Sequence, residues 1–183
     1  MALGDQLLEL DGWLQRFAPA SYASLRPSAS PKVLREAAVA FGRPLHPALI
    51  ELFDWHDGTS NMPAESFQLA PDFGFIGLSD ALDEWTHWNA FFGDTITDSR
   101  IGPSSQSWFP IAVDWCGGLL VVDHDQPDGY GQVFSTDPEQ GSRQDEGWKS
   151  LTSLVDDVLG SLNSRQSLRD YDPVVREGLL VWE

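Results

Sequence analysis

The chain has 183 residues, including eight Trp, and its 11 Lys and Arg against 28 Asp and Glu give a formal net charge of −17. A chain of this length buries about 70% of its unfolded surface in one core, and 42% apolar with only 21% charged residues argues against intrinsic disorder. The negative charge would repel a phosphate backbone, so we expect no direct binding of nucleic acid; it suits a basic protein partner or serves solubility.

Cysteine content and the N-terminus set further limits. The chain has one cysteine, Cys116, which excludes an intramolecular disulfide and a thiolate zinc cluster. The first residues lack the basic start and apolar stretch of a signal peptide, and no apolar run reaches the roughly 18 residues of a membrane helix. We therefore expect a cytoplasmic protein with no membrane partner.

Helical periodicity dominates the N-terminal third of the chain. Apolar residues recur at three- and four-residue steps over residues 3–17, and Pro19 ends this predicted helix. Residues 19–30 form a predicted connector. A second helix is expected from the Ser30-Pro31 start to about Phe41, since serine and proline favour a helix N-terminus.

The next segment mixes helices and one strand. A third helix begins at Pro47 and ends near Gly58, and residues 59–72 are predicted to be a loop because they show no periodicity. Aromatic and β-branched content predicts a strand at 73–78. Ser79 is then expected to cap a helix that carries two Trp.

An antiparallel β-meander is predicted over residues 108–136. Its three β-rich runs are separated by the turn residues Gly117-Gly118 and Pro127-Asp128-Gly129. The run at 119–122 is continuously apolar, which predicts a central strand covered on both faces.

The C-terminal third contains one more clear helix. A polar loop is predicted at 138–147, and the apolar spacing from Leu151 to Leu162 predicts a helix capped by Ser150. The tail that follows carries enough apolar residues to dock on the domain.

Several motifs occur in an order that is typical of a known family. Residues 45–58, LHPALIELFDWHDG, read as a Leu-Pro helix ending in a glycine turn, with His46 inside the Leu-Pro pair. Residues 75–85 combine a strand with the helix start LSDAL, and residues 108–134 carry W-h-P-h-x-x-D followed by GQV. With a weaker match at 148–154, these motifs span residues 34–162 and resemble the SUKH superfamily, the cell-wall-assembly-regulator-like proteins that include many bacterial toxin-immunity proteins.

The resemblance implies an α+β fold in a single domain, with an antiparallel β-sheet of about four to six strands flanked by helices, in agreement with the pattern of predicted elements. We expect an N-terminal helix and connector at 1–30, the SUKH-like α+β domain at 31–162, and a C-terminal extension packed on the domain at 163–183. The resemblance also implies protein binding without catalysis, often of a toxin such as a nuclease, although some relatives act as regulatory scaffolds.

The acidic stretch at 123–129 invites a calcium-site interpretation. In an EF-hand loop counted from Asp123, however, Pro127 stands at a ligand position, Asp128 at the glycine position and Phe134 at the closing acid. A turn whose Asp side chains bind local backbone explains the stretch better, so no metal is predicted.

Catalytic readings of the sequence find little support. Cys116 with His56 or His124 would supply a nucleophile and a base, but no nucleophile-elbow sequence surrounds the cysteine, and a lone Cys entering an apolar strand is usually a small buried group. The four histidines lack zinc-ligand spacing, and the glycines at 117–118 match no phosphate-binding loop. We predict no catalytic residue, no cofactor and no enzymatic activity.

The candidate partner-binding residues are carboxylates beside exposed tryptophans. An aromatic group ringed by carboxylates suits a basic protein surface. The set expected at the ends of the meander strands is Asp114, Trp115, Asp123, Asp125 and Asp128, bordered by Asp54, Trp55 and Asp57. The leading hypothesis is an immunity protein that neutralises a cognate basic toxin domain, a nuclease for example; the alternative is a regulatory scaffold of the cell-wall-assembly-regulator type with no toxin partner. The oligomeric state stays open.

Overall fold

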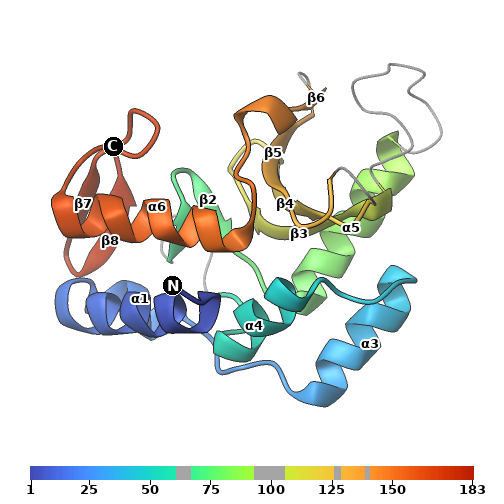
Figure 1. Ribbon diagram of the computed structural model, residues 1–183, viewed down its shortest axis with the longest axis horizontal. Helices are drawn as coiled ribbons and strands as arrows, with labels where there is room; N and C mark the ends of the chain where they lie inside the picture. The colour runs from blue at the N-terminus through green and yellow to red at the C-terminus, as the bar shows by residue number, and fades with distance from the viewer. Residues whose placement is uncertain (61–66, 93–105, 126–128, 139–140) are drawn as a thin grey trace.

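The predicted meander forms the middle of a six-stranded antiparallel sheet (Figure 1). This computed structural model describes residues 1–60, 67–92, 106–125, 129–138 and 141–183. In these residues six α-helices flank the large sheet, and a separate two-stranded sheet lies near the C-terminus. The arrangement confirms the predicted α+β class and single domain. None of the helices in the described part combines the length and apolar character that crossing a membrane requires.

The strands of the large sheet are hydrogen-bonded in sequence order, each antiparallel to the next. They are β1 (Gln68–Ala70), β2 (Phe73–Phe75), β3 (Trp108–Val113), β4 (Leu119–Asp123), β5 (Val133–Asp137) and β6 (Gly141–Ser142). The meander prediction is confirmed by β3, β4 and β5.

Strand β4 lies between β3 and β5 and is covered on both faces, as its continuous apolar run predicts. Leu120 and Val122 belong to the main core beneath the helices. Leu119 and Val121 point to the other face, where they pack in a second cluster with Trp88 and two aromatic residues of the sheet. Because side chains alternate along a strand, one five-residue strand serves both cores.

Six helices surround the sheet. They are α1 (Leu3–Phe17), α2 (Pro19–Ser24), α3 (Pro31–Phe41), α4 (Pro47–Trp55), α5 (Leu78–Phe92) and α6 (Leu151–Ser164). α1 packs against both α4 and α6, while α5 packs against α3 and β3 (Figure 1). The N-terminal helix is therefore part of the main core rather than an appendage.

Helix ends follow the capping residues of the sequence. The Ser30 hydroxyl accepts the Val33 N–H at the start of α3, and Gly42 closes that helix in the left-handed conformation with φ 77°. At α6, Ser150 and Ser153 form a reciprocal capping box. α4 begins instead with the His46 ring, whose Nδ1 accepts the Ala48 N–H over 3.1 Å.

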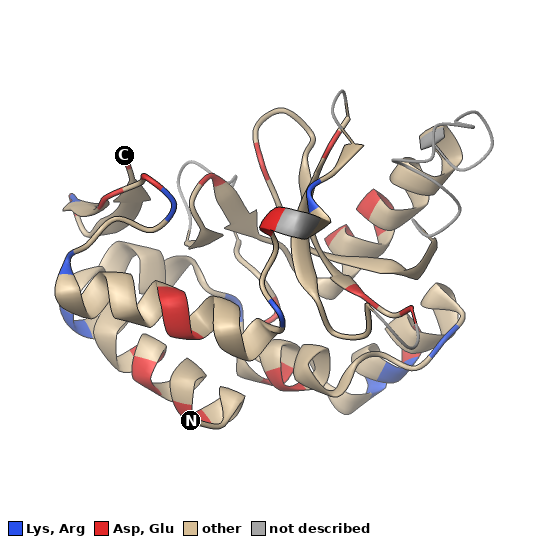
Figure 2. Ribbon diagram, turned by 45° about the horizontal axis from the view of Figure 1, so that its top comes forward, with Lys and Arg blue, Asp and Glu red and all other residues tan. Residues whose placement is uncertain are grey.

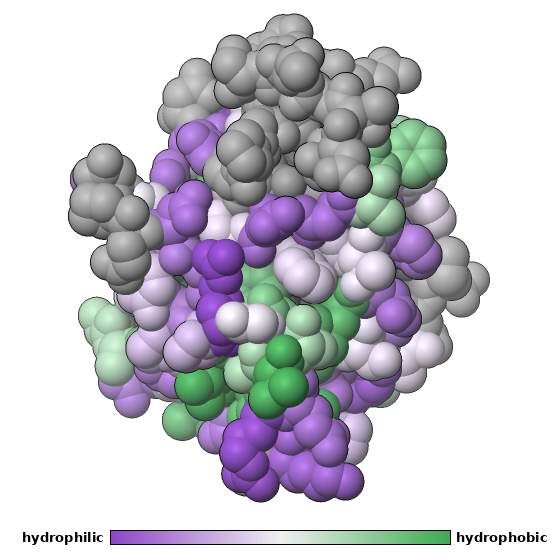
Figure 3. Space-filling view, turned by 90° about the vertical axis from the view of Figure 1, so that its right-hand side faces the viewer, coloured by the Kyte–Doolittle hydropathy of each residue, from purple (hydrophilic) through white to green (hydrophobic). Residues whose placement is uncertain are grey.

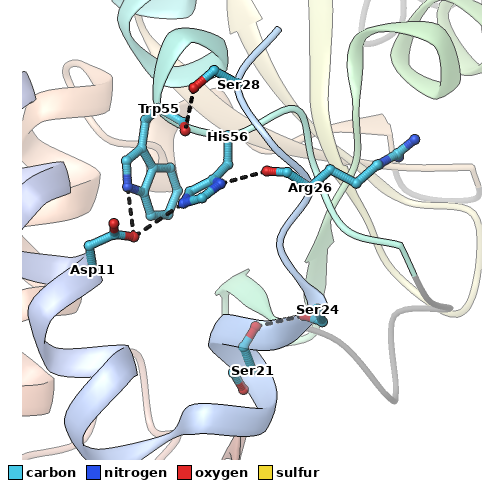
Figure 4. A network of polar contacts seen from close by, with 7 residues as sticks. All are labelled: Asp11, Ser21, Ser24, Arg26, Ser28, Trp55 and His56. Carbon is cyan, nitrogen blue, oxygen red and sulfur yellow. Dashed lines mark hydrogen bonds and ion pairs between the residues drawn. The ribbon is translucent and has the colours of Figure 1, made fainter.

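A polar network joins α1 to the end of α4 (Figure 4). The Oδ1 atom of Asp11 accepts hydrogen bonds from Trp55 Nε1 at 3.0 Å and lies 3.2 Å from His56 Nε2. The other ring nitrogen of His56 lies 2.5 Å from the carbonyl oxygen of Arg26. One carboxylate thus fixes two aromatic side chains, and with them the chain leaving α4.

The C-terminal residues form the two-stranded sheet of β7 (Pro173–Arg176) and β8 (Leu179–Trp182). The carbonyl of Gly178 accepts the N–H groups of Ala20 and Ser21, and the Leu180 N–H donates to the Ser21 hydroxyl at 2.8 Å. These bonds dock the hairpin on α2, and Leu180 and Trp182 join the main core.

Five stretches differ from the sequence-based prediction. α2 occupies the start of the expected connector at 19–30, because Pro19 suits the first position of a new helix. β1 lies in the expected loop at 59–72, and its three residues are too few to show a period. The strand expected at 73–78 ends at Phe75, and the loop expected at 138–147 contains β6 and the short 3₁₀ helix η3 (Gln144–Glu146). α6 runs to Ser164, inside the stretch expected as the C-terminal extension.

Candidate functional site

The turn between β3 and β4 is built around the Asp114 carboxylate. Its Oδ1 atom accepts the N–H groups of Cys116 and Gly118, each over 2.7 Å. Gly117 takes a left-handed φ of 84°, and a Cβ on Gly118 would lie only 2.5 Å from Asp114 Oδ2. The sequence Asp-Trp-Cys-Gly-Gly therefore folds into a fixed turn. The residue between Asp114 and Cys116 lies at the tip of this turn.

The residue at this tip is Trp115, which is 57% exposed. It borders a hollow of about 550 Å³ that runs from the turn to the first turns of α5. Asp80 and Glu84 of α5 line this hollow together with Asp114 and Arg26. The guanidinium of Arg26 is already paired with Asp80 over 2.5 Å, so the hollow keeps an excess of negative charge beside an exposed indole.

A second hollow, of about 580 Å³, also has Asp114 in its lining. It is bounded by the β1–β2 turn, by β5 and by the segment before β7. Its charged and aromatic lining consists of Asp72, Phe73, Asp114, Asp137, Arg143, Glu146, Trp148, Arg169, Asp170 and Tyr171. Asp114 therefore lines both acidic hollows, and Trp115 borders the first of them.

Carboxylates outnumber guanidinium groups across the two hollows. Arg143 lies 3.9 Å from Glu146, and Arg169 sits 3.4 Å from the centre of the Trp148 ring and donates to the Glu146 carbonyl. Figure 2 shows acidic residues, in red, on α5 and on the loops above the sheet, with few basic ones among them. We call Trp115 with the seven carboxylates the Trp115 face: Asp72, Asp80, Glu84, Asp114, Asp137, Glu146 and Asp170.

Two side chains that line the second hollow have shifted pKa values. A hydrogen bond to the Asp72 carboxylate, with the nearby negative charge, raises the pKa of Tyr171 above its ordinary value. Burial lowers the pKa of Arg169, and the charges of Glu146 and Asp157 oppose that change. Nearby carboxylates raise the pKa of a neighbouring acidic group in this way, here the Tyr171 hydroxyl beside Asp72 and Asp170.

The candidate residues at the β4–β5 end lie away from the Trp115 face. Asp114 and Asp123 flank opposite ends of β4, whose five residues span about 15 Å at 3.3 Å per residue. Asp123 is only 4% exposed, and its Oδ1 accepts the Ser107 hydroxyl and the Asp125 N–H. Burial raises its pKa, against the effect of these hydrogen bonds. Asp123 thus holds a loop in place, Asp125 is exposed beside it, and Asp128 lies outside the described residues.

The candidate residues at the end of α4 also do not join the Trp115 face. Asp54 is exposed on α4, whereas Trp55 is half-buried and donates its indole N–H to Asp11. Asp57 Oδ1 accepts the Leu78 N–H at 2.8 Å, at the first residue of α5. Trp55 and Asp57 are therefore structural contacts, and Asp57 supports the helix that carries Asp80 and Glu84.

The groups considered for catalysis or metal binding do not come together. Cys116 is exposed in the β3–β4 turn, which corrects the expectation of a buried apolar thiol: the chain has not yet entered β4 at that residue. His124 lies at the opposite end of β4, and His56 faces Asp11. Within the described ranges no group of three His, Cys, Asp or Glu side chains is placed to hold a metal ion.

Six carboxylates of the Trp115 face were not among the candidates, and one of them, Glu146, belongs to η3. Asp72 and Asp80 lie in the β1–β2 turn and at the start of α5, Glu84 lies one helical turn later, and Asp137 and Asp170 lie at the end of β5 and before β7. They reach Asp114 only through sheet pairing and through the docking of the C-terminal segment. A signal was present for Asp80 alone, since an acid in the first turn of a helix is a recognisable feature.

The chemistry of the Trp115 face is that of a receptor for cations. Carboxylates only accept hydrogen bonds, so Lys and Arg side chains are their matching partners, and an exposed indole adds a surface for guanidinium stacking.

Comparison with known families identifies the fold more narrowly. The sequence model of the SMI1 / KNR4 family (SUKH-1) matches residues 28–157, which confirms the predicted resemblance to the SUKH superfamily. No curated protein sequence matches the chain. The matched range holds α3, α4, α5, the large sheet and the first half of α6, whereas α1, α2 and the β7–β8 sheet lie outside it.

Proposed function

Because the chain belongs to the SMI1 / KNR4 family (SUKH-1), we propose that it is a protein-binding module whose Trp115 face holds a basic partner protein. The observation that carries the proposal is the pairing of an exposed indole with two acidic hollows at one fixed turn. A Trp at the centre of an interface often supplies a large share of the binding energy, while surrounding charges set partner choice and association rate.

Two electrostatic effects favour a basic partner protein. The net charge of −17 attracts a basic protein from a distance, and the Trp115 face supplies the local acceptors once contact is made. Binding needs no bond-making step. Covering the partner's basic surface is sufficient to block the use of that surface for nucleic acid or another anionic ligand.

In the leading form of the proposal the partner is a toxin domain, and the chain protects the cell that makes it. The family resemblance and the acidic charge support this form. The alternative is a regulatory scaffold that binds a cellular protein through the same face. A toxin gene beside this one, and survival of toxin-expressing cells only when the chain is co-expressed, distinguish immunity from scaffolding.

Matched charge variants test the face itself. One variant carries E84Q, D114N, D137N and D170N on the Trp115 face. Its control carries D5N, E36Q, D54N and D125N at exposed positions elsewhere. Both lose the same charge, so both lose the same long-range attraction. Binding to the partner captured from native lysate, or rescue from the toxin, is then compared in parallel.

The expected result is that the face variant weakens binding by about tenfold or more while the control stays within about threefold of the wild type. W115A alone is expected to weaken binding by about thirtyfold, which corresponds to the truncation of a central Trp. Equal loss in the two charge variants would mean that overall charge acts without this face. Unchanged binding in both W115A and the face variant would refute the Trp115 face as the interface.

A further inference from the structure

A second exposed surface, of different character from the Trp115 face, lies beside strand β7. It is a groove of about 470 Å³ between the C-terminal ends of α1 and α6 and strand β7. Its lining is mostly apolar: Trp13, Phe17, Leu162, Asn163, Arg165, Pro173, Val174 and Val175. Phe17 is 45% and Val175 is 40% exposed, so two large apolar groups remain uncovered. We call this surface the α1–β7 groove; it lies outside the residues that match the family.

One wall of the groove is an open strand edge. Asp172 and Glu183 exchange both backbone hydrogen bonds, so the pairs of Val174 with Val181 and of Arg176 with Leu179 are the other hydrogen-bonded pairs of the hairpin. Val175 and Leu180 form a pair whose N–H and C=O groups point outward. On β8 the outward Leu180 N–H is bonded to Ser21. On β7 the outward groups of Val175 have no partner among the residues that the structure describes.

Two arginines lie at this groove, although Glu9 accepts a hydrogen bond from the lining residue Asn163 over 3.1 Å. Arg165 lines the groove, and the Arg16 guanidinium lies 4.9 Å from the centre of the Phe17 ring. None of the lining residues is acidic. Two copies of the chain meeting here would bring like charges together at the groove and across two bodies of charge −17. A second copy is therefore a poor occupant, and an acidic segment of another protein is a good one.

We propose that the α1–β7 groove binds an extended acidic peptide segment of another protein, which adds as a strand to the outer edge of β7. Backbone groups of the peptide pair with the N–H and C=O of Val175. Alternate side chains of the peptide then point into the groove, where apolar ones contact Trp13, Phe17 and Leu162, and carboxylates on the same segment reach Arg16 and Arg165. The module would thus hold two partners of opposite charge on separate surfaces.

A synthetic peptide that carries Glu, Val, Val and Glu at alternate positions, with Thr at the positions between them and a label at its N-terminus, is a direct probe of this groove. Fluorescence anisotropy with the full chain measures its binding, and the same peptide with Lys in place of Glu is the charge control. The Glu peptide is expected to bind at least about tenfold more tightly than the Lys peptide, although the overall charge of the chain favours the Lys peptide. Equal binding, or tighter binding of the Lys peptide, would overturn the proposal.

Two variants locate the site. R165E is expected to weaken the Glu peptide by about tenfold. Its control is R35E on α3, where Lys32, Arg35, Glu36 and the 81% exposed Val39 line another shallow hollow, which lacks a strand edge. Figure 3 shows this side of the molecule, with apolar side chains beside strongly polar ones in its lower half. R35E should leave binding unchanged; equal effects of the two variants would show non-specific charge attraction and refute the site.

Val175 separates strand addition from simple apolar contact. V175P removes the outward N–H, which no bond of the hairpin uses, whereas V175A removes most of the side chain and keeps the N–H. V175P is expected to weaken binding of the Glu peptide by about tenfold, and V175A by less than about threefold. The reverse order would refute strand addition. A concentration-dependent dimer of the wild type that V175P dissolves would assign the groove to a second copy and overturn the peptide proposal. Binding at the Trp115 face is measured separately and does not enter either outcome.

Discussion

The backbone N–H of His46 donates a hydrogen bond to the Nε2 atom of His124 over 3.0 Å. The Nδ1 atom of His124 lies 3.1 Å from the Val122 carbonyl, so this ring carries its proton on Nδ1 and accepts at Nε2. The contact ties the start of α4 to the end of β4, and only neutral His124 can make it. Burial, with the charges of His46 and Arg43, lowers the pKa of His124 from 6.5 to about 4.

This bond predicts a pH-dependent stability. The unfolded chain binds a proton on His124 below about pH 6.5, whereas the folded chain resists until about pH 4, so the unfolding free energy falls as the pH drops through this window. The loss from this one group reaches about 3 kcal/mol. The lowered pKa of His46, also from burial, acts in the same direction.

Urea unfolding at several pH values between 4 and 7 measures this effect as the difference between wild type and H124Q, because glutamine offers both a donor and an acceptor without titrating. The difference should shrink as the pH falls. Asp123 acts oppositely, since its raised pKa lets the folded chain take up a proton before the unfolded chain does, but it is present in both proteins and cancels. Parallel pH profiles of the unfolding free energy in wild type and H124Q would contradict the assigned role of His124. The variant H87Q, at an exposed position, controls for the loss of a histidine.

A second prediction concerns two glycines with opposite surroundings. A Cβ on Gly118 would lie 2.5 Å from Asp114 Oδ2 and 2.8 Å from the Thr136 carbonyl, so G118A should cost about 1–3 kcal/mol. Gly12 lies in α1 with nothing within 4 Å of its Cβ position, so G12A should gain about 0.5–1 kcal/mol. Denaturant midpoints test the pair; a loss of stability in G12A or none in G118A would count against the packing described.

The Asp114 carboxylate is expected to serve folding through its oxygen and binding through its charge. D114A loses the acceptor of two backbone N–H groups and should cost about 1–2 kcal/mol. D114N keeps an acceptor oxygen and should cost less than D114A, while both weaken partner binding. Equal stability of the two variants would show that the turn does not depend on these hydrogen bonds.

The network around Asp11 predicts a loss of stability without any change in charge at the Trp115 face. D11A leaves the Trp55 indole N–H and the His56 ring without their shared acceptor and should cost about 1–3 kcal/mol. D83A, at an exposed position of α5, removes the same charge and should change stability by less than about 0.5 kcal/mol. Thermal unfolding of both variants provides the comparison, and similar midpoints would contradict a structural role for Asp11.

The fold was largely predictable because its main elements carry local signals. The continuous apolar run at 119–122, the Ser150 cap and the proline starts of α3 and α4 depend on neighbouring residues only. β1 and the β7–β8 hairpin were missed because short strands are stabilised by their partners. The docking of β8 on Ser21 joins residues 159 positions apart, which no local pattern reports.

The site was only partly predictable for the same reason. Asp114 and Trp115 were identified from the turn sequence, and the structure places Asp114 at both hollows and Trp115 at the first. Asp123 lies at the far end of β4 and is buried. This difference from Asp114 depends on the contact with Ser107, which comes from another segment. The acids of the Trp115 face come from six separate segments of the chain, so their proximity arises from topology rather than from sequence spacing.

Site-specific photo-crosslinking tests the central claim most directly. A photoreactive phenylalanine analogue replaces Trp115 in one protein and Val39, an 81% exposed residue of α3, in the control, and both are irradiated in native cells. The account predicts that position 115 forms an adduct with a basic protein, that position 39 does not, and that high salt before irradiation of a lysate abolishes the adduct. An adduct at position 39 only, or an acidic partner at position 115 whose capture ignores salt, would contradict it.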